Sequence, residues 1–552
     1  MRIALAQANP TVADLPGNRE RLTALARRAA EGGARLAVFP ELALVGYPPQ
    51  DLLDEPGFVR HAIDEEERWV EELGKVVPGL TVIYGSLTLN PNPEAKPLQN
   101  TVALARDGAV LARRVKTLLP SYDVFDEDRW FARATDNTPV EHDGHRLGLT
   151  VCEDAWNDVE YHSRPLYSHD PVAALAETGA SLLVNVSASP HHRGKPAERE
   201  AMFGAAARRH GLPLLFVNQV GGQDELTFDG HSAVFDAQGR VVARAAGFEE
   251  DLLLAELPDD DTPALPELPS GDIKELRSAL TLGLSDYLRK CGFSDVVLGL
   301  SGGIDSAVVA ALAADALGPD RVTGVMMPSR YSSDGSVDHS VDLAERLGIE
   351  TLKIPIEPAH SGLLSMLDAV LPEEVRSITE ENLQARIRGT LLMALSNQRG
   401  WLVLSTGNKS ELALGYCTLY GDMNGGLSVL GDCYKGWVRE LAELYHERGQ
   451  MPRSIIDKPP SAELRPDQVD TDSLPPYDLV DTVLTKLIEG RGTVDDVAAA
   501  GHSRETAVSL RRRLDGNEYK RRQAPPVLRV STRAFGPGRR LPLARGPWPP
   551  RD

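Results

Sequence analysis

Residues 296–318 place an apolar run, VVLGL, directly before a glycine turn, SGG, and a helical pattern, IDSAVVAALAADALG. This order predicts a buried strand, a tight turn and a helix, which are the parts of a layered α/β fold. Glycines let the backbone N–H groups of such a turn approach an anion, and the start of the helix adds partial positive charge. A tight βα turn without a ligand is the simpler alternative.

This turn is not a P-loop, because no GK[ST] sequence follows its glycines. Asp305 lies inside the turn and would repel a bare phosphate, so a Mg²⁺ ion between the two is the natural partner. Ser301 and Ser306 can donate hydrogen bonds to the same anion. We therefore predict a phosphate loop of a different type.

The chain is too long for one hydrophobic core, since its 552 residues exceed the size at which single cores stop growing. Strand-like runs alternate with amphipathic stretches over residues 1–257, which predicts a first α/β domain. Residues 258–272 concentrate proline and acid and predict an extended linker. A second α/β domain is predicted over 273–536, and a Pro-, Arg- and Gly-rich tail over 537–552 is predicted to be disordered.

Charge and cysteine spacing narrow the class of protein. A net charge of −21 disfavours nucleic-acid binding. No uninterrupted apolar run reaches about 18 residues and the N-terminus lacks signal-peptide features, so we expect neither a membrane span nor secretion. The four cysteines show no CxxC spacing, which disfavours a zinc site or a disulfide framework. A cytoplasmic protein with small-molecule partners is expected.

The C-terminal end departs from this acidic average. From Arg511 onward, twelve Lys or Arg residues stand against three acids. This excess indicates either a solvated basic face or a patch for a phosphorylated small molecule.

The SGG-x-DS sequence after a buried strand resembles the pyrophosphatase motif of ATP-dependent adenylating enzymes. Five further segments resemble the NAD synthetase family: MPSRYSSDGSVDHS (327–340), ENLQARIRG (381–389), STGNKSELALGYCTLYGDMNGG (405–426), KPPSAELRPDQVDTDSLPPY (458–477) and EYKRRQAPP (518–526). The resemblance implies a Rossmann-like adenine nucleotide alpha hydrolase (ATP pyrophosphatase) domain. It also implies that ATP is cleaved to AMP and pyrophosphate while a substrate carboxylate becomes an acyl-adenylate.

The same resemblance implies roles for individual residues. Those for ATP are Gly299, Leu300, Ser301, Gly302, Gly303, Ile304, Asp305, Ser306, Thr406, Lys435 and Ser461. Those for deamido-NAD⁺ are Asn382, Glu411 and Lys520, with Arg386 one helical turn from Asn382. Asp305 and Glu411 would hold Mg²⁺. The GDCYKGW sequence around Lys435 departs from the valine-containing form that is commoner in the family.

The N-terminal half resembles the nitrilase, or carbon–nitrogen hydrolase, superfamily. LAVFPELALVGYPPQDLL contains Glu41, RRVKTLLPSYDVFDEDRWF contains Lys116, and TVCEDAW contains Cys152. The resemblance implies an αββα sandwich in which Cys152 attacks the side-chain amide of glutamine and Glu41 acts as the general base. Lys116 would stabilise the oxyanion and favour the thiolate.

The residues around this triad are less sharply defined. Tyr122, Ser189 and Lys195 resemble the family's glutamine contacts, whereas His191 and His192 are interpreted as an exposed loop. Glu153 and Asp154 directly follow Cys152, and like charge beside a thiol raises its pKa. Whether these two acids position the site is left open.

Together the two resemblances imply ATP-dependent amidation of deamido-NAD⁺ to NAD⁺, with ammonia from glutamine hydrolysis in the first domain. The products would be NAD⁺, AMP, pyrophosphate and glutamate, and Mg²⁺ would be the cofactor. Both families usually self-associate, so a homo-oligomer is expected. The alternatives are an adenylating amidotransferase for another carboxylate and a nitrilase-type amidase with a nucleotide-sensing domain.

Overall fold

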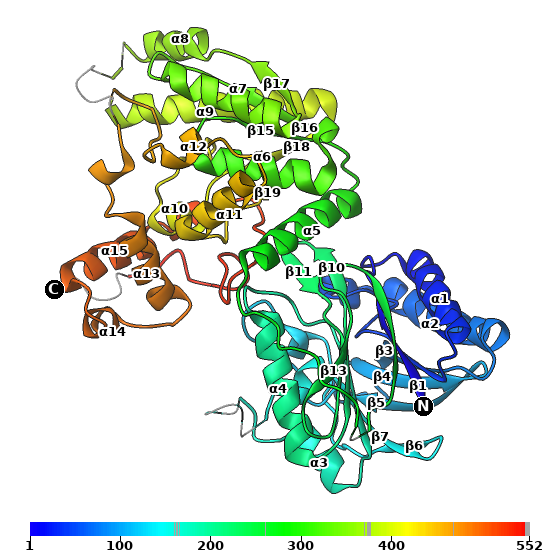
Figure 1. The fold of residues 1–552 in the computed structure, drawn as a ribbon. Helices are drawn as coiled ribbons and strands as arrows, with labels where there is room; N and C mark the ends of the chain where they lie inside the picture. Colours follow the sequence, from blue (N-terminus) through cyan, green and yellow to red (C-terminus); the bar gives the residue numbers. More distant parts are fainter. Residues whose placement is uncertain are drawn as a thin grey trace. The chain divides into compact units, whose positions relative to one another are not determined.

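The chain divides into two compact units, Met1–Asp272 and Ile273–Asp552 (Figure 1). The structure, a computed structural model, describes residues 1–158, 161, 164, 166–259, 261–368, 370–371, 377–466 and 468–546. A search of these described residues finds no helix that is both long and apolar enough to cross a membrane.

Two six-stranded sheets form the centre of the first unit. In spatial order, the first sheet holds β14 (Asp251–Glu256), β1 (Arg2–Gln7), β2 (Leu36–Val38), β3 (Thr81–Leu89), β4 (Leu98–Arg106) and β5 (Ala109–Val115). The second holds β13 (Val241–Arg244), β12 (Ala233–Phe235), β9 (Leu214–Asn218), β8 (Leu182–Ser187), β7 (His145–Val151) and β6 (Val140–His142). A hairpin, β10 (Val220–Gln223) and β11 (Leu226–Asp229), lies outside both.

Alternation along the strands explains why these sheets pack face to face. Ile3 and Leu5 of β1 share a core with Val184 and Val186 of β8, whereas the intervening Ala4 contributes to a different core. That second core lies under α1 (Leu15–Glu31) and α2 (Pro56–Val76). A third core lies under α3 (Pro171–Glu177) and α4 (Lys195–His210), on the outer face of the second sheet. The resulting four layers confirm the predicted αββα sandwich.

The second unit is built on a parallel sheet in the order β17 (Glu350–Lys353), β16 (Val322–Met326), β15 (Val296–Gly299), β18 (Leu402–Ser405) and β19 (Leu427–Ser428). α6 (Ile304–Leu317) follows β15 and is apolar on nearly all sides. An apolar surface on nearly all sides is stable here because α6 is covered by the sheet, by α5 (Ile273–Cys291) and by α11 (Lys435–Glu447). The predicted strand, turn and helix over 296–318 are confirmed.

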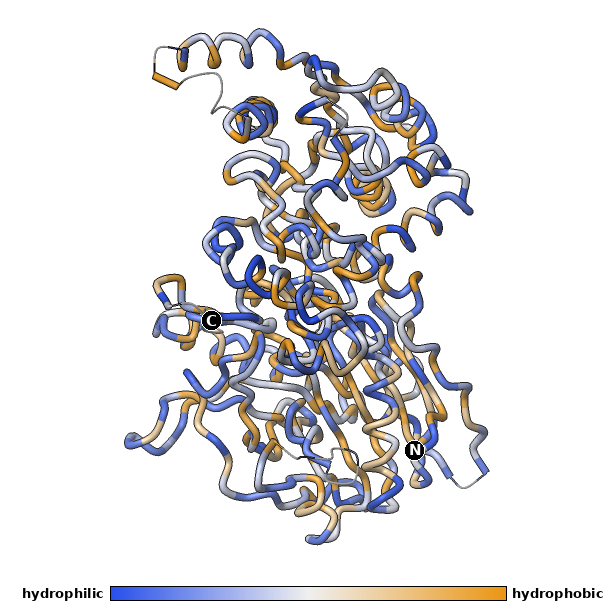
Figure 2. The backbone as a smooth tube through the Cα atoms, turned by 90° about the vertical axis from the view of Figure 1, so that its left-hand side faces the viewer, coloured by the Kyte–Doolittle hydropathy of each residue, from blue (hydrophilic) through white to orange (hydrophobic). Residues whose placement is uncertain are grey.

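The remaining helices complete the second unit. They are α7 (Asp334–Leu347), α8 (Glu357–Leu367), α9 (Ser377–Arg399), α10 (Lys409–Leu414), α12 (Arg453–Asp457), α13 (Tyr477–Ile488), α14 (Val494–Ala499), α15 (Arg504–Gly516) and α16 (Glu518–Arg521). α13 to α15 form a separate core with α10. Within each unit, Figure 2 shows hydrophobic colouring concentrated along the inner strands and helices.

The predicted linker and the predicted disordered tail both make contacts within their own units. Residues 258–272 contain no helix or strand among those described, but they lie along the first unit, where Leu265 N donates to Val241 O at 2.7 Å. In the tail, Arg539 is 6% exposed and its Nη1 donates to Glu518 at 3.1 Å. The prediction of disorder is therefore wrong for this part of the tail, because ion pairing anchors it. Residues 547–552 lie outside the described residues.

Candidate active sites

Glu41, Lys116 and Cys152 each follow a strand of the first unit. Glu41 comes after β2, Lys116 directly follows β5, and Cys152 directly follows β7. The Lys116 Nζ atom lies 2.8 Å from Glu41 Oε1, and both side chains are fully buried. Cys152 is 6% exposed and has a φ of 40°, a left-handed value that strains a side-chain-bearing residue at a sharp turn.

A fourth buried residue, Glu127, joins this group. Its Oε1 accepts hydrogen bonds from Lys116 Nζ at 2.8 Å and from Tyr47 OH at 2.7 Å. Sequence analysis did not single out Glu127, because it is one of several acids in DVFDEDRWF. Only burial distinguishes it, since the side chain of its neighbour Asp128 is about half exposed and pairs with Arg133.

Lys116 is held between two carboxylates, and this changes its expected effect on the thiol. Burial alone would lower the pKa of Lys116, but Glu127 and Glu41 raise it well above the usual range. Burial raises the pKa of the Cys152 thiol well above its usual value, Glu41 raises it further, and Lys116 only partly opposes them. Lys116 thus acts in the expected direction, toward the thiolate, but burial and the carboxylates around it outweigh its effect on the pKa of Cys152.

Asp154 and Glu153 have separate tasks next to Cys152. Asp154 accepts hydrogen bonds from the backbone N–H groups of Val151, Thr117 and Leu118 at 2.8–3.0 Å. It thus ties the end of β7 to the segment after Lys116. Burial raises its pKa to about 6.

Glu153 instead faces two tyrosines. Its carboxylate accepts hydrogen bonds from Tyr122 OH at 2.9 Å and from Tyr167 OH at 3.0 Å. Burial raises the pKa of Glu153, although both tyrosines and Lys195 act in the opposite direction. The structure therefore answers the question left open by the sequence: Asp154 positions the turn, and Glu153 belongs to the wall around Tyr122.

The predicted glutamine contacts lie in the same unit. Ser189 is 4% exposed and follows β8, and its backbone N–H donates to Asn218 Oδ1 at 2.8 Å. Lys195 is the first residue of α4, and its Nζ atom lies 3.7 Å from the ring centre of Trp156. The interpretation of His191 as exposed is wrong. It is fully buried, with Nδ1 3.7 Å from Asp229, because this strand-following loop folds into the interior.

In the second unit, the predicted phosphate loop has an ordered internal network. Ser301 Oγ accepts a hydrogen bond from Gly303 N at 3.2 Å, and the hydroxyls of Ser301 and Ser306 lie 3.1 Å apart. Gly302 has a φ of 74°, and a Cβ there would lie 2.3 Å from Ser336 O. Only glycine fits this position, since the loop turns tightly against the start of α7.

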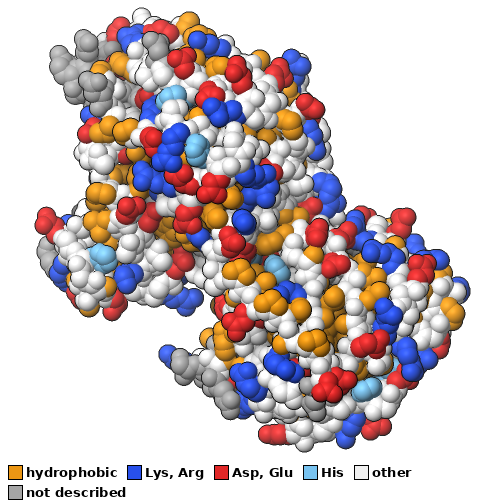
Figure 3. All heavy atoms as spheres, viewed as in Figure 1, with side chains coloured by type: hydrophobic (Ala, Val, Ile, Leu, Met, Phe, Trp, Pro, Cys, Tyr) orange, Lys and Arg blue, Asp and Glu red, His pale blue; other side chains and the backbone are white. Residues whose placement is uncertain are grey.

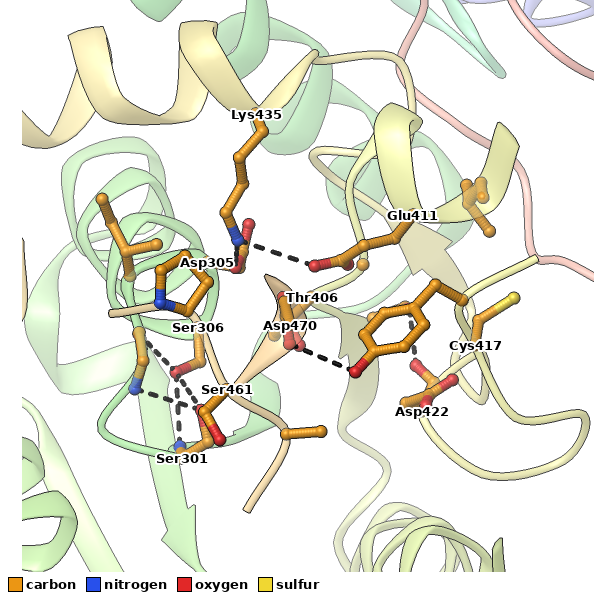
Figure 4. Close-up of a pocket in the computed structure, with 18 of the residues that line it drawn as sticks. Ser301, Asp305, Ser306, Thr406, Glu411, Cys417, Asp422, Lys435, Ser461 and Asp470 are labelled. Carbon is orange, nitrogen blue, oxygen red and sulfur yellow. Dashed lines mark hydrogen bonds and ion pairs between the residues drawn. The ribbon is translucent and has the colours of Figure 1, made fainter. Parts of the chain in front are cut away.

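Three charged side chains face each other above this loop. Lys435 Nζ forms an ion pair with Asp305 Oδ2 and lies 3.6 Å from Glu411 Oε1. Figure 4 shows Lys435 reaching between the two carboxylates, which come from α6 and α10. Burial and the charge of Asp305 raise the pKa of Glu411 to about 8, although Lys435 lowers it. Lys435 therefore offsets the negative charge of these two carboxylates only in part.

Two adjoining pockets meet at this loop. The first has an empty volume of about 1040 Å³ and is lined by the predicted residues Ser301, Gly303, Ile304, Asp305, Ser306, Thr406, Glu411, Lys435 and Ser461. The second, of about 1170 Å³, is lined by Gly299, Leu300 and Ser301 and by apolar side chains that include Met326, Met327 and Leu392. Ser301, Thr406 and Ser461 line both pockets.

The second pocket also contains a residue that sequence analysis missed. Arg388 donates from Nε to Met327 O at 3.0 Å, and burial lowers its pKa to about 10. It lies two residues after Arg386 in ENLQARIRG, and the sequence alone does not show which of the two arginines faces a pocket. Arg386 is exposed and donates to Leu419 O at 3.1 Å.

Two predicted dinucleotide contacts do not line either pocket. Asn382 accepts a hydrogen bond from Thr418 at 2.9 Å. Lys520 Nζ donates to the backbone carbonyls of Gly415 and Cys417, both at 2.7 Å. In this structure Lys520 supports the loop after α10. Several other basic residues of the C-terminal end form ion pairs within the unit, among them Arg521–Glu518 and Arg511–Asp515. Over the face in view, Figure 3 shows charges of both signs interspersed.

Comparison with known proteins accounts for the whole chain. Residues 2–266 match the carbon–nitrogen hydrolase family and residues 276–524 match the NAD synthase family. The glutamine-dependent NAD(+) synthetases of a Synechocystis strain and of Thermotoga maritima are 46% and 40% identical to it, each over 98% of both chains.

Solved structures agree with this. The glutamine-dependent NAD⁺ synthetase of Acinetobacter baumannii, solved with ADP, is 37% identical, covers 98% of both chains and superposes with a TM-score of 0.76. The corresponding protein of Cytophaga hutchinsonii, at 21% identity, shows the same fold with a TM-score of 0.81. With its two units, its buried Glu–Lys–Cys group and its phosphate loop, this chain belongs to the glutamine-dependent NAD⁺ synthetase family.

Proposed function

We propose that this protein converts deamido-NAD⁺ to NAD⁺ with ATP and glutamine. The observation that carries the proposal is the presence of both active-site groups in one chain: Cys152 with its buried acid–lysine partners, and the phosphate loop with Asp305, Glu411 and Lys435 above it. The near full-length identity to glutamine-dependent NAD⁺ synthetases supports the same substrates.

In the first unit, Cys152 Sγ attacks the side-chain amide carbon of glutamine while the thiol proton moves to Glu41. The carbon–nitrogen bond then breaks, Glu41 gives the proton to the departing nitrogen, and ammonia leaves a glutamyl thioester on Cys152. Water, deprotonated by Glu41, hydrolyses the thioester to glutamate. Lys116, held by Glu41 and Glu127, donates to the oxyanion that forms at each attack.

The protonated resting state of Cys152 predicts a pH profile for alkylation. Because burial and Glu41 raise the pKa of this thiol, its reaction with iodoacetamide should be slow at pH 7 and should still accelerate above pH 9. The rate is measured by mass spectrometry of the Cys152 peptide, which separates it from the exposed Cys291. A plateau below pH 7 would show a stable thiolate and contradict this arrangement.

Replacing Glu127 should slow glutamine hydrolysis, although Glu127 contacts Lys116 and makes no hydrogen bond to the Cys152 thiol. Glu127→Gln leaves Lys116 with a single carboxylate partner, which draws the ammonium toward Glu41 and weakens the base. We expect glutamine hydrolysis to fall roughly 10²- to 10³-fold, within the range typical of lost acid–base assistance. Asp128→Asn, at the exposed neighbouring position, is the matched control and should keep the parental rate. Equal rates for both variants would remove Glu127 from the mechanism.

We propose that Glu153 and Lys195 recognise the two charged groups of glutamine's α-carbon. Glu153 presents a carboxylate next to the nucleophile, held by Tyr122 and Tyr167, and suits the α-ammonium. Lys195 is near enough to act on the pKa of Glu153 and suits the α-carboxylate. Ser189, whose hydroxyl accepts a hydrogen bond from Arg199 at 3.4 Å, remains a proposed further contact for glutamine.

In the second unit, the carboxylate of deamido-NAD⁺ attacks the α-phosphorus of ATP and pyrophosphate leaves. Ammonia then attacks the adenylated carbonyl, and AMP departs as NAD⁺ forms. The loop serines and Lys435 bind the phosphates. Arg388, Met327 and Leu392 suit the adenosine portion, and the ADP complex of the A. baumannii relative supports nucleotide binding here.

A magnesium ion fits the donor set above the loop. Asp305 and Glu411 supply two carboxylates directed at one positive charge, and the raised pKa of Glu411 shows that further positive charge would stabilise its ionised form. These two residues would hold the ion, which supplies neutralisation of the polyphosphate charge when bound. Asn382 and Lys520 remain proposed contacts for the dinucleotide.

Product analysis tests the proposal directly. The protein, ATP, Mg²⁺ and glutamine are incubated with deamido-NAD⁺ or with other carboxylates, and NAD⁺ and pyrophosphate are measured. Stoichiometric formation of NAD⁺, AMP and pyrophosphate is expected. Pyrophosphate release only with another acid would favour a different amidotransferase, and glutamine hydrolysis without ATP consumption would favour an amidase with a nucleotide sensor.

We further propose that the protein works as a homo-oligomer in the cytoplasm. Two large apolar side chains are strongly exposed, Met366 of α8 at 76% and Ile378 of α9 at 71%. Their exposure supports self-association. Four cysteines without a disulfide, one of them the proposed nucleophile, suit a reducing compartment. Light scattering of the purified chain tests the oligomeric state.

A further inference from the structure

Asn408 connects the two carboxylates proposed to hold Mg²⁺. It is fully buried at the N-cap of α10, where its Oδ1 accepts the Glu411 backbone N–H at 3.0 Å. Its own N–H donates to Glu411 Oε2 at 3.3 Å, which completes a capping box. Its Nδ2 donates to Asp305 Oδ1 at 2.8 Å, across from α10 to α6.

These contacts fix the direction of the Asn408 amide. Because Oδ1 must face the Glu411 N–H, Nδ2 is left facing Asp305. One oxygen of each carboxylate is thereby occupied: Oδ1 of Asp305 and Oε2 of Glu411. The other two oxygens, Asp305 Oδ2 and Glu411 Oε1, are the ones that face the Lys435 ammonium.

We propose that Asn408 is the positioning residue that aims one oxygen each of Asp305 and Glu411 at a shared divalent cation. Three properties are needed at this position, namely a helix cap, a donor for Asp305 and no negative charge. Serine and threonine supply the cap and no negative charge, but their hydroxyl lies one bond nearer the backbone than Nδ2 and does not reach Asp305 while it caps α10. Aspartate lacks the donor and would repel Asp305. This inference rests on the proposed function, because it assumes that the cation binds at these two acids.

Serine separates the cap from the donor. Asn408→Ser should keep the cap and a parental melting temperature, but it should weaken cation binding about tenfold, as loss of a group that orients metal ligands does. Asn408→Ala should lose both stability and cation affinity. Asn408→Thr caps in the same way as serine and serves as the second variant without an amide that reaches Asp305.

Binding is measured with Mn²⁺ as the probe, from the loss of the free-ion EPR signal on titration into the full-length protein without nucleotide, because the phosphates of a nucleotide would themselves bind Mn²⁺. A tenfold weaker Mn²⁺ affinity in Asn408→Ser or Asn408→Thr, with an unchanged melting temperature, is the expected result. Parental affinity in both would show that Asn408 is only a helix cap.

A second measurement separates failure of this inference from failure of the proposed function. Asp305→Asn should lose nearly all Mn²⁺ binding if this carboxylate is a ligand. If Asp305→Asn binds Mn²⁺ normally, the proposed cation site itself is wrong. If Asp305→Asn loses binding while the serine and threonine variants keep it, only the role of Asn408 is overturned.

Discussion

Replacing Cys152 by alanine is expected to abolish NAD⁺ synthesis from glutamine while leaving synthesis from ammonia intact. The alanine side chain has no nucleophile, so no glutamyl thioester forms and no ammonia is released. The phosphate loop and its carboxylates belong to the other unit and have no part in this step. The glutamine-dependent rate should fall at least 10³-fold, whereas the rate with ammonium chloride should change less than about twofold.

The measurement is NAD⁺ formation from deamido-NAD⁺ and ATP with each nitrogen donor in turn. Cys291→Ala is the matched control, because Cys291 is exposed at the end of α5 and should leave both rates unchanged. Residual glutamine-dependent synthesis near the parental rate would exclude Cys152 as the nucleophile. Loss of both activities in a folded Cys152→Ala protein would contradict the division of tasks between the units.

The architecture could be predicted from the sequence because each domain carries a strong local pattern. The buried strand VVLGL, the SGG turn and the mostly apolar α6 leave few alternatives to a parallel α/β sheet. The residues that follow strands, Glu41, Lys116 and Cys152, were predictable for a similar reason. Each lies in a distinctive local sequence, and the packing of the two sheets brings these strand ends together.

The supporting residues could not be predicted, because burial and partner choice depend on contacts across the fold. Glu127 is one acid among several neighbours, and only packing beside Tyr47 selects it. Asn408 is part of a recognised motif, but its bond to Asp305 joins residues 103 positions apart. Lys520 was assigned to a ligand by its context, yet it reaches backbone carbonyls of its own unit.

The pKa of the Cys152 thiol depends on contacts that its local sequence does not show. From sequence, Lys116 alone was expected to offset the acids and to favour a thiolate. The structure places two carboxylates on that ammonium, so its positive charge is already balanced. Activation then depends on transfer of the proton to Glu41 during attack.

The second large effect is expected at Asp305, whose replacement by alanine should abolish synthesis with either nitrogen donor. Asp305 forms the ion pair with Lys435 and accepts the Asn408 hydrogen bond. Without it, Lys435 loses its ion pair with Asp305 and keeps the longer one to Glu411 at 3.6 Å, and the proposed cation loses one of two carboxylate ligands. Because adenylation precedes amide formation, the rates with glutamine and with ammonia should both fall at least 10³-fold.

The controls for Asp305 distinguish chemistry from folding. Asp320→Ala removes an exposed acid shortly after the same helix and should keep parental rates. Glutamine hydrolysis, measured as glutamate release, should persist in Asp305→Ala, because Cys152 and its partners lie in the other unit. Normal ammonia-driven synthesis in this variant would exclude Asp305 from the phosphate site. Since Cys152→Ala blocks one nitrogen donor and Asp305→Ala blocks both, the pair of variants orders the two reactions: ammonia release supplies a nucleophile, and adenylation makes the carboxylate able to accept it.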